Sequence, residues 1–192
     1  MIELRDYQGE AVAAIYNWFQ RETGNPIVVA PTGAGKSLIM AEFIRSACVQ
    51  YPQTRILVVT HVKELIAQDA SAILRLWPSA PVGIYSAGLG KRQAHRQIVV
   101  AGVQSIAKRM GEIGAFDLVI VDEAHLIPRS SETLYGRLFD ALRAANPLVK
   151  IVGLTATPYR LDSGRLDRGD GSLFDGIAYD IPVGMLVERG YL

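Results

Sequence analysis

Residues 30–37 read Ala-Pro-Thr-Gly-Ala-Gly-Lys-Ser, a glycine-rich stretch that directly follows a short apolar run. Such a turn presents backbone N–H groups and a helix N-terminus to phosphates, where the peptide dipoles favour negative charge. Lys36 can then reach the β- and γ-phosphates of a nucleotide, and the Ser37 hydroxyl can bind Mg²⁺. The strict phosphate-loop pattern begins with Gly where this chain has Ala30. The residues expected around the phosphates are Thr32, Gly33, Ala34, Gly35, Lys36 and Ser37.

A second polar group, Asp122-Glu123-Ala124-His125, follows the apolar run 118–121. Magnesium prefers few carboxylates together with phosphate oxygens and water, so Asp122 and Ser37 are the expected metal ligands. Lys36 and Ser37 would otherwise be the first turn of an ordinary helix. The glycine spacing and the later acidic pair favour phosphate binding, and they predict ATP and Mg²⁺ as cofactors.

The composition fits one large α/β domain. With 192 residues, of which 49% are hydrophobic, the chain can bury a full core. The net charge is only +1, so any contact with nucleic acid must come from local patches. The single cysteine, Cys48, excludes an internal disulfide. No apolar run approaches the about 20 residues of a membrane span, and no secretion signal begins the chain, so we expect a cytoplasmic protein without membrane contact.

Strands and helices are predicted to alternate along the chain. Short β-branched runs without polar alternation are typical of strands buried on both faces, and helical spacing lies between several of them. This order implies right-handed crossovers and a mainly parallel sheet. The expected strands are 27–30, 56–60, 98–101, 118–121 and 151–154. The expected helices are 38–49, 64–77, 132–145 and one that precedes the first strand and ends at 24–26.

Each chemically informative stretch follows one of these strands. Ligands of open α/β sheets bind beyond the carboxyl ends of the strands, so the five stretches predict one site. They are 30–37, 60–61, 102–105, 122–125 and 155–157. Residues 161–176 differ from the rest because they are rich in Gly, Asp, Arg and Ser, and we predict a mobile loop there.

In order, these motifs resemble the first RecA-like lobe of a superfamily 2 helicase or translocase of the DEAD/DEAH-box kind, from residue 4 to about residue 158. Leu4-Arg5-Asp6-Tyr7-Gln8 resembles the adenine-reading Q motif, residues 30–37 motif I and residues 60–68 motif Ia. Residues 102–105 are similar to motif Ib, 122–125 to motif II and 155–157 to motif III. Motifs I and II together are highly specific, and Ala30 is usual in this family.

The resemblance implies a P-loop NTPase fold, a RecA-like three-layer α/β/α sandwich, with residues 1–192 forming one helicase ATP-binding domain. Thr155-Ala156-Thr157-Pro158-Tyr159-Arg160 and the closing residues 187–192 are similar to the branch that holds restriction-enzyme motor subunits and excision-repair helicases. Motifs IV to VI, including an arginine finger, lie in the family's second lobe and have no counterpart in this chain. Two lobes would need roughly twice this length. We therefore expect a second RecA-like lobe in cis or in trans, the alternative being a chain that binds ATP without much turnover.

The resemblance also implies roles within the ATP site. Lys36, Asp122 and Glu123 would be the catalytic residues, with Glu123 orienting and deprotonating the attacking water. His125, Thr155 and Thr157 would couple the nucleotide to nucleic acid. The alternatives are a structural histidine and two threonines that simply end a strand.

For the adenine ring, the Gln8 amide can pair with N6 and N7, and Arg5 or Tyr7 can stack on the ring. The alternative for Gln8 is an exposed helix start.

Nucleic acid is the expected partner, with DNA favoured over RNA. Hydroxyls, amides and backbone N–H groups at strand ends contact phosphates without reading bases. The candidates are Thr60, His61, Lys63, Gly102, Gln104 and Ser105. The basic stretch 91–96 is either a solvated loop or a further binding patch.

The predicted function is an ATP-binding lobe that couples Mg-ATP hydrolysis to nucleic-acid binding, weak or inactive in isolation because its arginine lies elsewhere. One alternative is a nucleotide-dependent binding or assembly module without motor activity. Another is a P-loop kinase or small-molecule ATPase.

Overall fold

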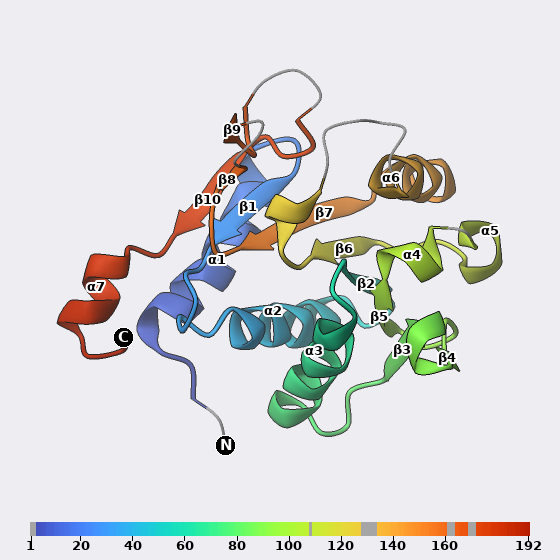
Figure 1. The fold of residues 1–192 in the computed structure, drawn as a ribbon, viewed down its shortest axis with the longest axis horizontal. Helices are drawn as coiled ribbons and strands as arrows, with labels where there is room; N and C mark the ends of the chain where they lie inside the picture. The colour runs from blue at the N-terminus through green and yellow to red at the C-terminus, as the bar shows by residue number, and fades with distance from the viewer. Residues whose placement is uncertain (1–2, 108, 128–133, 161–163, 169–171) are drawn as a thin grey trace.

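The computed structural model describes residues 3–107, 109–127, 134–160, 164–168 and 172–192. Its main feature is an eight-stranded sheet in the order β10-β1-β7-β6-β2-β5-β3-β4, with every neighbouring pair parallel except β3 and β4 (Figure 1). The strands of this sheet are β1 (Pro26–Val29), β2 (Ile56–Thr60), β3 (Val82–Ser86), β4 (Lys91–Arg92), β5 (Ile98–Gly102), β6 (Leu118–Val121), β7 (Lys150–Thr155) and β10 (Gly176–Asp180). A separate hairpin pairs β8 (Tyr159–Arg160) with β9 (Gly164–Arg165).

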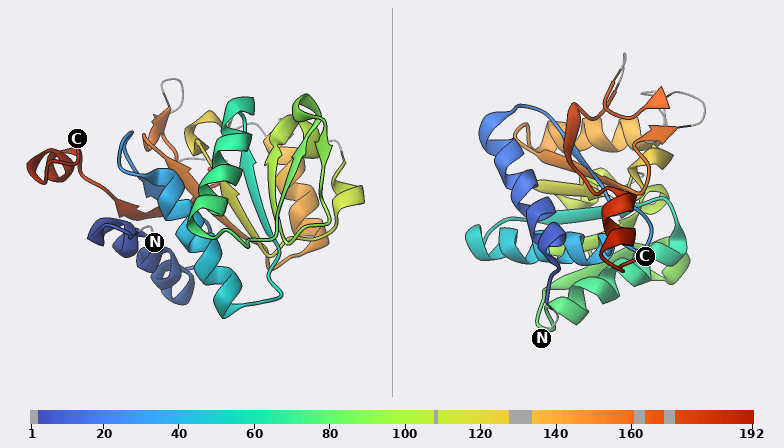
Figure 2. Two further views of the ribbon diagram at one scale, coloured as in Figure 1. Left: turned by 90° about the horizontal axis from the view of Figure 1, so that it is seen from below. Right: turned by 90° about the vertical axis from the view of Figure 1, so that its left-hand side faces the viewer.

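Helices cover both faces of the sheet (Figure 2). They are α1 (Asp6–Arg21), α2 (Lys36–Gln50), α3 (Lys63–Leu76), α4 (Val103–Ile106), α5 (Met110–Ile113), α6 (Leu134–Ala145) and α7 (Val183–Glu188), with short 3-10 turns η1 (Ala87–Leu89) and η2 (Ala124–Leu126). Within the described ranges, no helix has the length and apolar character to cross a membrane.

Successive strand residues divide between two cores because side chains alternate across a strand. In β2, Ile56 and Val58 belong to the core that also holds residues of α1, α2 and α3, whereas Leu57 and Val59 belong to the core that holds residues of α4, α5 and α6. The four side chains are fully buried. Both faces of the strand are therefore apolar, which explains its continuous run of hydrophobic residues.

The predicted α/β class and mainly parallel sheet are confirmed. All five expected strands form, each within two residues of the expected bounds, and the helices 38–49 and 64–77 appear as α2 and α3. Helix 132–145 appears as α6 from Leu134, and residues 132–133 lie outside the described part of the chain.

Three strands of the main sheet were not predicted. β3 and β10 each contain a glycine and are only partly buried, and β4 has two exposed basic residues. The prediction of a loop was therefore wrong for Lys91 and Arg92, which pair with β3 at the sheet edge. Part of the expected mobile loop lies outside the described residues. Its described part includes β9 and buries Leu166 and Phe174, so backbone pairing and packing anchor it.

Candidate active site

The predicted motifs meet at one edge of the sheet. The strands β1, β2, β5, β6 and β7 run parallel, so their carboxyl ends, and the motif that follows each, lie together (Figure 1). The prediction that one sheet edge carries these stretches therefore holds in the fold.

The glycine-rich loop between β1 and α2 forms a cradle. Gly33 and Gly35 have φ angles of +88° and +80°, a left-handed conformation that favours glycine, and Lys36 then starts α2. A cavity of about 530 Å³ lies against this loop. Its lining includes Thr32, Gly33, Gly35, Lys36, Ser37, Asp122, Glu123 and Ala156. The cavity thus has a helix N-terminus on one side and two carboxylates on another.

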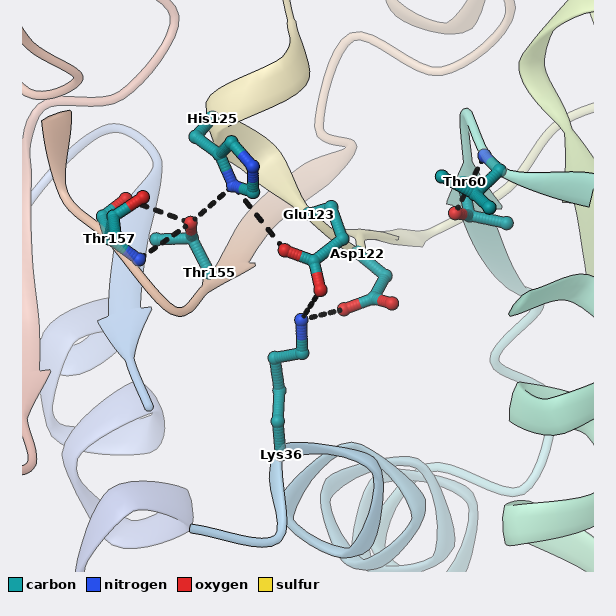
Figure 3. A network of polar contacts seen from close by, with 8 residues as sticks. Lys36, Thr60, Asp122, Glu123, His125, Thr155 and Thr157 are labelled. Atoms are coloured by element: carbon teal, nitrogen blue, oxygen red, sulfur yellow. Dashed lines mark hydrogen bonds and ion pairs between the residues drawn. The ribbon is translucent and has the colours of Figure 1, made fainter. Parts of the chain in front are cut away.

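Lys36 contacts the two carboxylates that directly follow β6 (Figure 3). Its Nζ atom is 3.0 Å from Asp122 Oδ1 and is also hydrogen bonded to Glu123 Oε1. Asp122 is 4% exposed, and burial raises the pKa of its carboxyl against the opposing effect of Lys36. Asp122 Oδ1 has this ion pair but no hydrogen-bond partner. The ammonium group therefore supplies the positive charge that this carboxylate requires.

Glu123 has an unusual backbone. Its φ of +51° is the only left-handed value at a non-glycine position in the described part of the chain. This conformation costs roughly 1–2 kcal/mol for an L-residue. It places the carboxylate between Lys36 and His125, whose Nδ1 is 3.3 Å from Glu123 Oε2. Such strain is typical of functional positions.

The three predicted coupling residues form one polar chain with Glu123 (Figure 3). His125 Nδ1 lies 2.9 Å from Thr155 Oγ1. That hydroxyl donates to the Thr157 carbonyl at 2.8 Å and accepts from the Thr157 N–H at 3.2 Å. Residues from β7 and the loop after it are thereby tied to the end of β6.

The start of α1 holds the phosphate loop. Tyr7 and Gln8 each donate a side-chain hydrogen bond to the Ala34 carbonyl, at 3.1 and 3.0 Å. Gln8 also accepts from the Arg5 N–H at 2.9 Å, which caps its own helix. Gln8 is 3% exposed and Tyr7 1%, so the alternative interpretation of Gln8 as an exposed helix start is wrong. Tyr7 is also too buried to stack on adenine in this conformation.

The other adenine candidate, Arg5, is exposed and stacks on a residue that sequence reasoning did not assign to the site. Its guanidinium lies 4.0 Å from the ring centroid of Tyr191, which also contacts Tyr7 with centroids 5.7 Å apart. A Cβ atom on Gly33 would lie 2.3 Å from Leu192 Cδ2. The closing residues therefore pack beside the phosphate loop.

Five of the six nucleic-acid candidates surround one small cavity of about 100 Å³. They are His61, Lys63, Gly102, Gln104 and Ser105, joined by Ser86 and Gly88. Thr60 lies apart: it is fully buried, and its hydroxyl accepts from the Val62 N–H at 3.3 Å. We therefore correct the expectation for Thr60, because its side chain cannot reach a phosphate without rearrangement.

Two buried residues whose pKa values are raised in part by the charge of Asp122 were missed by sequence reasoning. Asp69 on α3 is 2% exposed, and burial raises the pKa of its carboxyl to about 8, helped by the negative charge of Asp122. Tyr135 on α6 is also 2% exposed. Nothing in the local sequence marks either residue, because helical patterns do not reveal which carboxylate a side chain will approach.

Comparisons with known proteins agree with this geometry. Residues 1–160 match the family described as "Type III restriction enzyme, res subunit". The chain is 34% identical over 189 residues to the DNA 3'-5' translocase XPB2 of Sulfurisphaera tokodaii and 32% identical over 201 residues to the DNA 3'-5' helicase XPB of Kineococcus radiotolerans. Each match covers 98% of this chain, but only 36% and 32% of the two relatives. The Pyrococcus furiosus Hef helicase domain superposes with a TM-score of 0.68 at 22% identity, covering 92% of this chain and 37% of that one.

Fold, site and relatives together define an ATP-binding, RecA-like lobe of the superfamily 2 helicases and translocases. Within that class, the chain belongs to the family of the type III restriction enzyme res subunit. The predicted family is confirmed.

Proposed function

We propose that this lobe binds Mg-ATP at the phosphate loop and couples ATP hydrolysis to binding of DNA. The observation that carries the proposal is the contact of Lys36 with both Asp122 and Glu123 at the cavity. The relatives named as a DNA translocase and a DNA helicase support DNA as the polymer. The chain spans about a third of the length of each relative. We therefore propose motor activity as part of this function.

The residues present fit a magnesium ion. Asp122 Oδ1 is buried, receives no hydrogen bond and already faces a cation, Lys36. Ser37 lines the same cavity and adds a hydroxyl oxygen, the kind of ligand that magnesium accepts. Asp122 and Ser37 would hold the ion, which would neutralise charge on the phosphate oxygens. Lys36 would then turn from the carboxylates to the β- and γ-phosphates.

Release of Lys36 leaves the Glu123 carboxylate free to accept a proton from water. Its second oxygen stays near His125, which holds the carboxylate in place while the first oxygen orients the attacking water. His125 also contacts Thr155. A movement of the Glu123 carboxylate would therefore alter the position of His125 and, through Thr155, of the loop after β7. These contacts support a coupling role for His125, Thr155 and Thr157.

DNA would bind along the cavity formed by His61, Lys63, Gly102, Gln104 and Ser105. Its lining offers a lysine, hydroxyls and an amide, which suit phosphate oxygens and not base edges. We infer binding that is independent of base sequence. A second RecA-like lobe would supply the arginine that completes the ATP site, and such a residue can be worth about 10³–10⁵ in rate.

Steady-state ATP hydrolysis tests the proposal. Turnover is measured with and without single- and double-stranded DNA and RNA, with Glu123→Gln as the blank. Without the second lobe we expect slow turnover, which DNA should raise above the blank. Glu123→Gln should lower the DNA-stimulated turnover by about 10²-fold or more while it still binds ATP. Lys36→Ala should lose nucleotide binding. Normal turnover in Glu123→Gln would contradict the role of Glu123, and ATP binding that no polynucleotide affects would contradict the coupling.

A further inference from the structure

The residues after α7 turn back onto the phosphate loop. Gly190, whose φ is +68°, reverses the chain where the helix ends. The N–H groups of Tyr191 and Leu192 then donate to the Leu186 carbonyl at 2.8 and 3.3 Å, and the Leu186 side chain is fully buried. The Leu192 side chain lies against Gly33 of the phosphate loop. Backbone hydrogen bonds and packing therefore fix where the Tyr191 ring lies relative to this loop.

The Arg5 guanidinium is held at two points, although the residue is exposed. Its Nη1 donates to the Tyr7 hydroxyl at 3.1 Å, and that hydroxyl donates to the Ala34 carbonyl of the phosphate loop at 3.1 Å. Its Cζ lies 4.0 Å from the centroid of the Tyr191 ring. A surface arginine ordinarily loses rotamer entropy when it binds a ligand. These contacts already restrict Arg5, so less entropy is lost when a ligand binds to it.

One side of this guanidinium is covered and the other is open. The Tyr191 ring covers the first side, and the exposure of Arg5 leaves the second to solvent. A planar guanidinium stacks on aromatic rings, including those of nucleotide bases. The Gln8 amide, the other expected adenine contact, is buried, accepts from the Arg5 N–H and donates to the Ala34 carbonyl. The open side of Arg5 is therefore accessible to a base without rearrangement.

We propose that Tyr191 is a positioning residue that holds the Arg5 guanidinium ready to stack on the purine base of the bound nucleotide. The base lies on the open side of Arg5, and Tyr191 lies on the other side. The inference rests on the proposed function and adds to its ATP site a residue that is distant in sequence. Stacking uses the ring face, which every base has, so Tyr191 favours nucleotides over triphosphate alone but does not distinguish adenine from guanine.

Three ligands separate this role from a general effect on the phosphate loop. ATP, GTP and inorganic tripolyphosphate are each titrated with Mg²⁺ against wild type and Tyr191→Ala. We expect Tyr191→Ala to weaken ATP and GTP binding by the same factor, about 3- to 30-fold, because the support for the guanidinium is lost. Tripolyphosphate binding should stay within about twofold of wild type. Tyr191→Phe keeps the aromatic ring and should bind all three ligands as wild type does.

A matched control is Tyr159→Ala. Tyr159 is 55% exposed and also lies beside an arginine, with Arg165 Cζ 5.8 Å from its ring centroid, but it does not line the described ATP cavity. The variant should bind all three ligands as wild type does. Equal weakening of tripolyphosphate and ATP binding in Tyr191→Ala would overturn the inference, as would unchanged ATP binding. Wild type that binds neither ATP nor tripolyphosphate would instead overturn the proposed function.

Discussion

Glu123 combines a strained backbone with a central place in the ion network. Its carboxylate contacts both Lys36 and His125, and its φ is +51°. A residue type that fits this conformation poorly is held there by contacts of its side chain. We therefore infer that the backbone cost is retained because the carboxylate must point into the cavity.

The strain predicts a difference between two small substitutions. Glu123→Ala and Glu123→Gly both lose the carboxylate, but only glycine adopts a positive φ without penalty. Glu123→Gly should therefore be more stable than Glu123→Ala by about 1 kcal/mol. Urea unfolding of the two variants measures this difference. Equal stabilities would show that the backbone relaxes once the side chain is lost.

Asp69 predicts how stability depends on pH. Its pKa is raised to about 8 in the folded protein, by burial first and then by the charge of Asp122, with Lys36 acting in the opposite direction and Glu123 adding to the rise. In the unfolded chain an Asp titrates at about 4. Between these values the folded protein keeps a proton that the unfolded chain has lost, so stability falls as pH rises.

Asp69→Asn removes this titration. The variant should gain stability relative to wild type between pH 5 and pH 8, by more than about 1 kcal/mol. Chemical unfolding at the two pH values gives the comparison. Asp140→Asn, at an exposed position of α6, is the control and should show no such gain. An identical pH dependence in wild type and Asp69→Asn would contradict this account.

The central strand β7 allows η2 to approach the sheet. Gly153 in β7 has no side chain, and the Phe174 ring and Ala124 of η2 fill the space above it. Because η2 carries His125, this packing helps to position the chain from Glu123 to Thr155. A glycine in a strand interior often marks such a close approach.

Gly153→Ala should therefore be destabilising. The added Cβ atom would lie 2.7 Å from the Phe174 ring and 3.1 Å from Ala124, so neighbours must move. We expect a loss of about 1–3 kcal/mol in the free energy of unfolding. Gly9→Ala is the matched control, because it lies in α1 with no atom within 4 Å of the new Cβ. It should be neutral or stabilising by up to about 1 kcal/mol.

The molecule gathers its ATP cavity and its proposed DNA surface at one edge of a single sheet. Loops after β1, β6 and β7 contribute to the first, and loops after β2, β3 and β5 to the second. With a net charge of +1, the chain has no general attraction for DNA. Binding must depend on a few local cations such as Lys63.

The salt dependence of DNA binding tests this arrangement. Lys63→Ala should reduce the slope of log affinity against log salt by about 0.9, because one phosphate contact is lost. The triple variant at Lys91, Arg92 and Arg96 is the comparison. These exposed residues do not line the described cavity, so the slope should stay at its wild-type value. A flattened slope in the triple variant would assign the basic stretch to the DNA surface.

Local sequence patterns were sufficient to predict a strand or a turn wherever the residues of one segment indicate its structure by themselves. The run Ile56–Thr60 is apolar and β-branched because both faces of β2 are buried, and the glycines of 30–37 mark a turn that only glycine adopts readily. The motifs at the sheet edge could be placed together because parallel strands end at the same side. β3, β4 and β10 escaped prediction because partly buried or exposed edge strands lack that continuous apolar run.

Contacts between distant segments could not be predicted. The charge effect of Asp122 on Asp69, the stacking of His61 on Tyr135 and the ring contact of Tyr191 with Tyr7 each join residues from different elements. Such pairs depend on how helices are rotated and packed on the sheet, and one helical pattern is compatible with many neighbours. The chain's own motifs thus specify an ATP-binding α/β lobe, whereas the folded packing specifies which buried groups touch its carboxylates, because periodicity encodes burial and not the identity of the partner.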